Sequence, residues 1–217
     1  MSTFATGFEA DTTHDFFLLG LAIDNNGNVF VAASDEMDSN LKTTIYEVMP
    51  NGTPSPFGWQ PVPGCECSVP GEGFGPAFDS ADNLFVANSG GPDNSDPSYQ
   101  AIFKFAPGGG ASSLFVQTTD FPEGTGPAGL AFDLSGNFFV STESAAPPTP
   151  YGEILEFTPA GAPYQPIPTG TPGVFATGLA HYPRGIAFDA GGNLFVAETG
   201  VPSPGDILEI SASGGVA

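Results

Sequence analysis

Small and bulky apolar residues alternate in a stretch near the end of the chain, residues 182–200, which reads YPRGIAFDAGGNLFVAETG. The small residues Gly185 and Ala187 alternate with larger ones, Asp189 and a glycine pair follow, and a second apolar run occupies 194–197. A cluster of Asp, Gly and Asn between two short alternating runs is typical of a β-hairpin. The pattern therefore predicts two antiparallel strands joined by a tight turn.

The same pattern occurs four times along the chain. The copies begin at Gly20, Gly75, Gly129 and Gly185, so successive starts differ by 55, 54 and 56 residues. A fixed period of this length indicates a repeat architecture. No stretch shows helical periodicity, so we expect the repeats to be made of strands.

Each hairpin is followed by further apolar runs that predict two more strands. The third strands are expected at 45–48, 102–105, 154–157 and 207–210. Weaker fourth strands are expected around Phe57, at 114–116 and at 174–176. A four-stranded antiparallel meander is the blade of a β-propeller. The sequence thus predicts an all-β, four-bladed propeller in one domain, with blades at 20–74, 75–128, 129–184 and 185–217, the last combined with 1–19.

The fourth copy ends shortly after its third strand and lacks a fourth. Residues 3–7 read TFATG and resemble VFATG at 174–178, where the third copy has its fourth strand. We therefore predict that an N-terminal strand completes the last blade, within one chain or from a neighbouring copy, because an unpaired edge strand invites pairing. The residues expected at this contact are Thr3, Phe4, Ala5 and Thr6, opposite Ile207, Leu208 and Ile210.

A bulky aromatic residue recurs at one position of each second strand. These residues are Phe30, Phe85, Phe139 and Phe195. Burial of a phenylalanine contributes about 1.5–3 kcal/mol. We interpret this set as the core between blades rather than the lining of a ligand pocket.

The charge of the chain is strongly negative, with 24 acidic residues against 3 basic ones and a net charge of −21. Such a chain repels phosphates, which excludes nucleic acids and anionic membrane surfaces as partners. It attracts cations, including calcium. No apolar run is long enough to cross a bilayer, and the first ten residues lack the features of a signal peptide. We expect an extracellular or cell-surface protein whose leader is not part of this sequence.

The repeat at 182–200 resembles an NHL-type propeller repeat and is similar to the blades of gluconolactonase-like and streptogramin-lyase-like propellers. The resemblance covers nearly the whole chain, although those families usually have six or seven blades. Lactonase-like propellers hold a metal with a mixed set of Glu, Asn and Asp. The resemblance therefore implies a cation site, for which Asn88, Glu143 and Glu198 at the ends of second strands are the candidates.

Other candidate residues have simpler interpretations. The turns that begin at Asp24, Asp79, Asp133 and Asp189 resemble half of a calcium loop, but Asp and Asn also build tight turns, and we favour that role. His181 has no nucleophile beside it in sequence. Cys65 and Cys67 are either free thiols or a cross-link, although a bridge between residues so close would be strained.

These observations favour a non-catalytic extracellular protein that binds copies of itself and polymerises head-to-tail by terminal strand exchange. The first alternative is a metal-dependent enzyme of the lactonase or lyase type. The second alternative is a module that binds glycans, peptides or other small molecules. Its candidate aromatic residues are Trp59, Tyr99, Tyr151 and Tyr164. Two copies could also form one eight-bladed ring.

Overall fold

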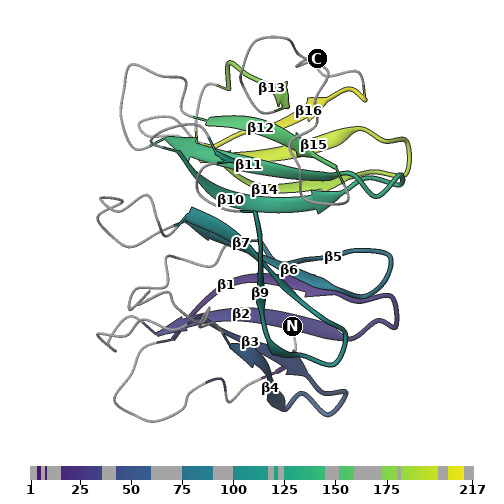
Figure 1. The fold of residues 1–217 in the computed structure, drawn as a ribbon. Coiled ribbons are helices and arrows are strands. Elements are labelled where there is room, and N and C mark those ends of the chain that lie inside the picture. The colour runs from purple at the N-terminus through teal and green to yellow at the C-terminus, as the bar shows by residue number, and fades with distance from the viewer. Residues whose placement is uncertain are drawn as a thin grey trace.

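A computed structural model describes most of the predicted strands and turns of the chain. The described residues are 4, 5, 8, 16–35, 43–59, 75–89, 100–116, 120–121, 125–144, 152–158, 173–179, 182–199 and 205–212. They form sixteen strands in four sheets, which confirms the predicted four-bladed, all-β propeller (Figure 1). Within this part of the chain no helix is long and apolar enough to cross a membrane.

Each sheet is an antiparallel meander in chain order. The first contains β1 (Phe16–Ile23), β2 (Val29–Asp35), β3 (Thr43–Val48) and β4 (Pro54–Trp59). The second contains β5 (Ala77–Phe78), β6 (Leu84–Ser89), β7 (Gln100–Phe105) and β9 (Ser113–Val116). The third contains β10 (Thr125–Phe132), β11 (Phe138–Ser144), β12 (Gly152–Phe157) and β13 (Val174–Ala176). The fourth contains β14 (Tyr182–Phe188), β15 (Leu194–Thr199) and β16 (Ile207–Ile210).

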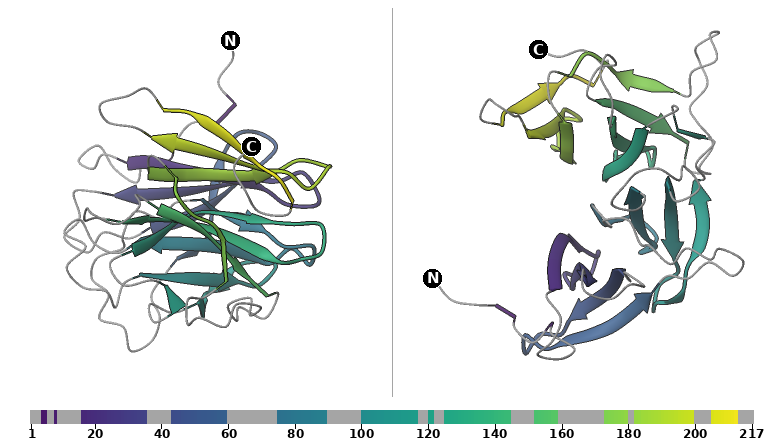
Figure 2. Two further views of the ribbon diagram at one scale, coloured as in Figure 1. Left: turned by 90° about the horizontal axis from the view of Figure 1, so that it is seen from above. Right: turned by 90° about the vertical axis from the view of Figure 1, so that its left-hand side faces the viewer.

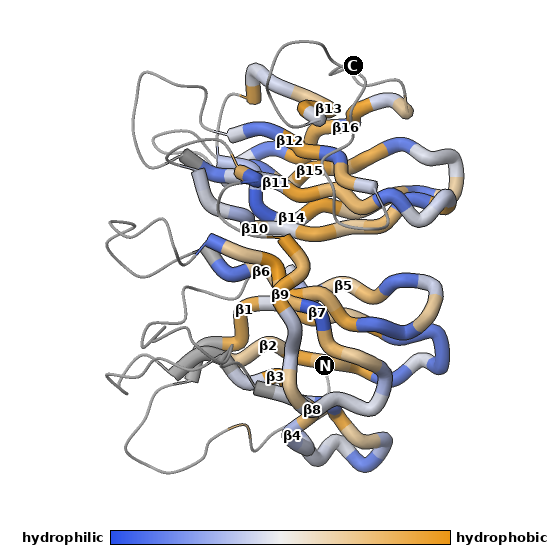
Figure 3. The backbone as a smooth tube through the Cα atoms, in the orientation of Figure 1, coloured by the Kyte–Doolittle hydropathy of each residue, from blue (hydrophilic) through white to orange (hydrophobic). Residues whose placement is uncertain are grey.

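One further short strand ties the first two sheets together. β8 (Gly110–Ala111) lies between β7 and β9 in sequence but pairs in parallel with β4, at the outer edge of the first sheet. The hydrophobic colours in Figure 3 follow the strands, and the hydrophilic colours gather at the hairpin turns. The alternation in the sequence was therefore sufficient to place the strands of each blade.

The four hairpin turns share one set of hydrogen bonds. In each turn one carboxylate oxygen of the aspartate that begins the turn accepts hydrogen bonds from the backbone amides two and four residues later, at 2.8–2.9 Å. The second oxygen of this carboxylate accepts a bond from the side-chain amide of the asparagine four residues later, at 2.7–3.1 Å. Asp24, Asp79, Asp133 and Asp189 therefore build the turns, as predicted.

The blades pack through phenylalanine pairs in a fixed order. A bulky residue on the innermost strand of one blade contacts the phenylalanine on the second strand of the preceding blade, with ring centroids 4.8–5.1 Å apart. The pairs are Phe78 with Phe30, Phe132 with Phe85, and Phe188 with Phe139. The predicted aromatic core is confirmed at these three junctions, where Phe30, Phe85 and Phe139 are buried.

The blades form an arc whose first and last members face each other across an opening (Figure 2, right). On the first blade Leu21 and Ile23 are 66% and 58% exposed, because no preceding blade covers that face. On the fourth blade Ile207 is 75% exposed. The packing rule that holds within the arc thus leaves one unmatched face at each end.

Phe4 and Phe8 lie on the first blade. The main-chain carbonyl of Phe4 lies directly against Gly52, in the turn between β3 and β4. The ring of Phe8 meets that of Tyr46 edge-on, with centroids 5.8 Å apart. Among the described residues the fourth sheet has three strands.

Completion of the last blade within one chain, which the sequence suggested, is therefore not the arrangement of this structure. The similarity of TFATG to VFATG predicted a strand on the last blade, but Phe4 and Ala5 lie beside Gly52 of the first blade. Thr3 and Thr6 lie outside the described residues. Pairing of these residues with a second chain stays a prediction.

Candidate functional site at the junction of the third and fourth blades

The contact between the third and fourth blades, which we call the third junction, contains one glutamate from each blade. Each of the two glutamates faces the opposite blade. On β11, Phe139 packs toward the fourth blade, so by alternation Ser141 and Glu143 face the same way. On β15, Leu194 and Val196 pack toward the third blade, and Glu198 continues that face. Glu198 is 4% exposed, and the side chain of Glu143 is 16% exposed.

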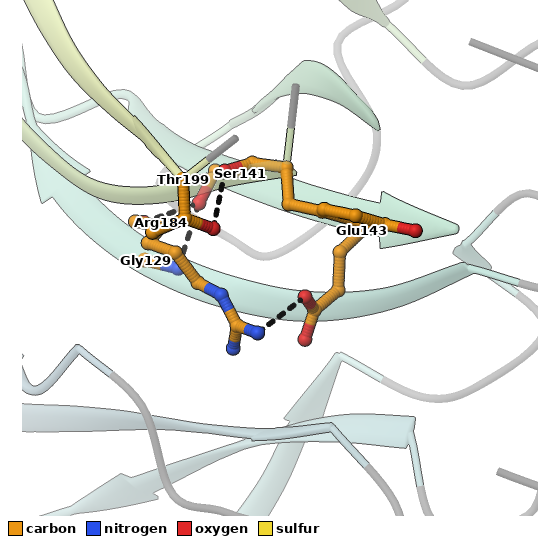
Figure 4. A network of polar contacts seen from close by, with 6 residues as sticks. Gly129, Ser141, Glu143, Arg184 and Thr199 are labelled. Atoms are coloured by element: carbon orange, nitrogen blue, oxygen red, sulfur yellow. Dashed lines mark hydrogen bonds and ion pairs between the residues drawn. The ribbon is translucent and has the colours of Figure 1, made fainter. Parts of the chain in front are cut away.

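Ser141 fixes the geometry of this junction. Its buried Oγ accepts a hydrogen bond from the Gly129 backbone amide at 2.7 Å and donates one to the Arg184 carbonyl at 2.7 Å (Figure 4). One hydroxyl therefore joins β10, β11 and β14. Buried polar groups of the two blades are satisfied together, which holds the strands that carry Arg184 and Glu143 in one register.

Arg184 points toward Glu143 and forms an ion pair with it (Figure 4). The distance from Arg184 Nη2 to Glu143 Oε2 is 3.1 Å. Arg184 is the single arginine of the chain. The pair is partly shielded from water, so a carboxylate and a planar set of N–H donors are held side by side where a polar ligand can reach them.

A second polar layer lies behind this pair. Thr142 is fully buried, and its Oγ1 bonds with both the amide and the carbonyl of Glu153 at 3.3 Å. Burial raises the pKa of Glu153 above its ordinary value of 4.5. Thr142 and Glu153 thus belong to the rigid support of the strand that carries Glu143.

The third residue of the predicted cation set lies elsewhere. Asn88 is buried and continues the face of β6 on which Leu84 and Val86 pack against the first blade. Its Oδ1 is buried without a hydrogen-bond partner among the described residues. Asn88 therefore faces the first junction, while Glu143 and Glu198 face the third. Within the described part of the chain no three His, Cys, Asp or Glu side chains lie together as metal ligands.

Sequence reasoning overlooked the role of Arg184. The available signal was composition: one of three basic residues in a chain with 24 acidic ones is expected to sit beside a carboxylate. The remaining predicted residues are not described. Cys65, Cys67, His181, Tyr99, Tyr151 and Tyr164 lie outside the described residues, as does the side chain of Trp59.

Comparison with known proteins finds the fold in solved structures. No family model and no curated protein sequence matches the chain. A glucose dehydrogenase aligns with a TM-score of 0.65 at 16% identity, covering 92% of this chain and 70% of the other. A gluconolactonase from Xanthomonas campestris aligns with a TM-score of 0.59 at 15% identity, covering 92% and 60%. A luciferin-regenerating enzyme gives 0.58 at 12% identity, covering 87% and 55%.

These comparisons correct the functional prediction from the sequence. The sequence alone favours a non-catalytic protein that polymerises, but similar solved structures are named as a gluconolactonase and glucose dehydrogenases. The absence of a familiar catalytic motif does not exclude an enzyme, because one fold hosts many functions through different sites. The chain spans about three fifths of the length of the gluconolactonase. Over that span it has the β-propeller fold of the gluconolactonase-like structures.

Proposed function

We propose that the chain hydrolyses cyclic esters of the lactone type at the third junction. The observation that carries this proposal is the ion pair of Glu143 and Arg184 at 3.1 Å, with buried Glu198 on the opposing blade. The fold shared with a gluconolactonase supports the choice of substrate class. A lactone is small and polar, and its carbonyl oxygen becomes negative in the transition state, which suits a guanidinium donor.

The two side chains have complementary roles in the reaction. The Glu143 carboxylate accepts a proton from a water whose oxygen forms a bond to the carbonyl carbon. The N–H groups of Arg184 stabilise the negative oxygen of the tetrahedral intermediate. When the bond from the carbonyl carbon to the ring oxygen breaks, Glu143 returns the proton to that oxygen. The product is one open-chain hydroxy acid, and no atom is unaccounted for.

A preformed metal centre does not fit these residues. Catalytic zinc sites generally have three protein ligands and an open position, and calcium sites have about six to eight oxygen ligands. This junction offers two glutamates among the described residues, and Glu143 is held by Arg184. Asn88 faces another junction. No step of the proposed reaction therefore uses a metal.

Hydrolysis of δ-lactones by the purified chain tests the proposal. We expect turnover by the wild type, with kcat lowered about a hundredfold or more in Glu143→Gln, as for loss of a general base. Arg184→Met should lower kcat by about the same factor through loss of oxyanion stabilisation. The matched control is Glu209→Gln, because Glu209 is an exposed residue of the fourth blade, the blade that carries Arg184. Lack of lactone turnover by the wild type would refute the proposal.

A chelator separates the two forms of the lactonase hypothesis. Incubation with EDTA should leave the rate unchanged if the ion pair of Glu143 and Arg184 does the chemistry. A rate that falls in EDTA and returns with calcium would instead support the metal-dependent form that the family resemblance implied.

A further inference from the structure

A small cavity lies between the hairpin turns of the first and second blades, in a part of the molecule that the proposed function does not use. Its volume is about 210 Å³. Its walls combine three carboxylates with three aromatic rings. The carboxylates belong to Asp24, Glu47 and Asp82, and the rings to Phe30, Phe57 and Phe78.

The three rings form a cup that recurs one blade further on. Phe30 meets Phe57 edge-on with centroids 4.8 Å apart, and it meets Phe78 at the same distance. At the second junction Phe85 contacts its two equivalents at 4.8 and 5.1 Å. The aromatic geometry of the first two junctions is therefore nearly the same.

At the second junction, between the second and third blades, a lysine of the protein places its ammonium group over the equivalent rings. Lys104 Nζ lies 5.2 Å from the centroid of Phe85 and 5.8 Å from that of Phe115, within range of a cation–π interaction. Lys104 stands opposite Phe85 in the ladder of β6 and β7. The residue opposite Phe30 in the corresponding ladder of β2 and β3 is Glu47. The first junction thus has a carboxylate where the second has an ammonium group.

The hairpin turn of the second blade supplies the first junction with a carboxylate that the other three turns lack. The third residue after the turn aspartate is glycine in three turns, with φ of 84°, 84° and 83° at Gly27, Gly136 and Gly192. In the second turn this position is Asp82, with φ of 59°. A residue with a side chain costs conformational energy there. Asp82 Oδ1 accepts a bond from the Asn25 amide at 3.0 Å, which places it between the two turns.

We propose that this cavity binds the primary ammonium group of a small alkylamine. The rings of Phe30 and Phe57 would receive the cation as Phe85 and Phe115 receive Lys104. The carboxylates of Glu47 and Asp82 would accept its N–H bonds. The volume suits a short amine better than a drug-sized ligand. A metal ion is disfavoured, because Asp24, Glu47 and Asp82 line the cavity but do not form a group of three side chains that could hold one metal ion.

Titration of ¹⁵N-labelled protein with n-butylammonium, followed by NMR, tests the proposal, and 1-butanol is the neutral control. We expect amide shifts in the strands and turns around Phe30, Phe57 and Asp82 with the amine and not with the alcohol. Glu47→Lys should weaken binding about tenfold or more, because the ammonium group of the introduced lysine would lie over Phe30 as Lys104 lies over Phe85. Glu209→Lys makes the same charge change on an exposed residue of the fourth blade and should leave the affinity unchanged.

Asp82→Gly provides a variant that restores the residue of the other three turns and should fold readily. It should weaken amine binding severalfold. The proposal is wrong if butanol produces the same shifts, if both variants bind like the wild type, or if the amine perturbs other residues instead. Displacement of the amine by calcium at lower concentration would also overturn it, by assigning the cavity to a metal.

Discussion

Gly129 lies so close to the main-chain carbonyl of Arg184 that no Cβ atom fits between the third and fourth blades. A Cβ built on Gly129 would overlap the carbonyl oxygen of Arg184 and lie 3.0 Å from Ser141 Oγ. The equivalent glycine of the fourth blade, Gly185, has no atom within 4 Å of the same position. The repeated glycine therefore serves blade contact, and the last copy keeps it on an uncovered face.

The substitution Gly129→Ala should destabilise the protein, whereas Gly185→Ala should not. Overpacking at Gly129 should cost about 1–3 kcal/mol or more, because the atoms in the way are backbone. At Gly185 the alanine is expected to change stability by less than about 1 kcal/mol, in the stabilising direction. Urea denaturation of the two variants measures the difference. Equal losses of stability would mean that a further blade or chain covers Gly185 in solution.

A second pair of equivalent residues tests the bulky face of the blades. Leu130 is 5% exposed in the core of the second junction, whereas Leu21 is 66% exposed on the first blade. Leu130→Ala should therefore cost about 2–5 kcal/mol, and Leu21→Ala no more than about 0.5 kcal/mol. Denaturation midpoints at several protein concentrations check both values. A large loss of stability in the Leu21 variant that depends on protein concentration would contradict the exposure of Leu21.

Repetition made the fold predictable. Each blade repeats the same alternation, so Gly129, Leu130 and Phe132 could be assigned to packing faces from their equivalents alone. The turn aspartates were equally clear, because Asp24 and Asp189 have the same spacing to an asparagine four residues later. Local patterns of this kind determine strands, turns and the contact between consecutive blades.

Glu143 and Glu198 were candidates from the sequence, but the contacts that make up the two sites were not predictable, because they depend on where the copies differ. Arg184 meets Glu143 through a contact between blades that no local pattern contains. Lys104 and Glu47 occupy one repeat position, and only the packed rings show that the exchange of charge matters. The N-terminal segment shows the limit of a local similarity, because Phe4 resembles a residue of a fourth strand but within one chain lies beside Gly52 of the first blade.

Removal of the Ser141 hydroxyl should loosen the third junction. Ser141→Ala leaves the buried Gly129 amide without its acceptor and the part-buried Arg184 carbonyl without this donor. The expected cost is about 1–3 kcal/mol of unfolding free energy. The control is Ser113→Ala, because Ser113 is exposed and its Oγ donates a longer bond, 3.3 Å, to the Lys104 carbonyl. An equal effect of both substitutions would argue against the bridging role.

Glu156 should make the protein less stable as the pH rises. Burial, and then the nearby charge of Asp133, raise the pKa of Glu156 above the ordinary value of 4.5. The folded chain therefore binds this proton more tightly than the unfolded chain, and stability is lost as the pH rises from 4.5 through the folded pKa. Glu156→Gln should be more stable than the wild type at neutral pH, and the difference should shrink below pH 4.5. Glu209→Gln, at the equivalent exposed position of β16, is the control for loss of one negative charge. Urea denaturation across this pH range measures both, and the same stabilisation in the two variants would show that net charge, rather than the surroundings of Glu156, sets the effect.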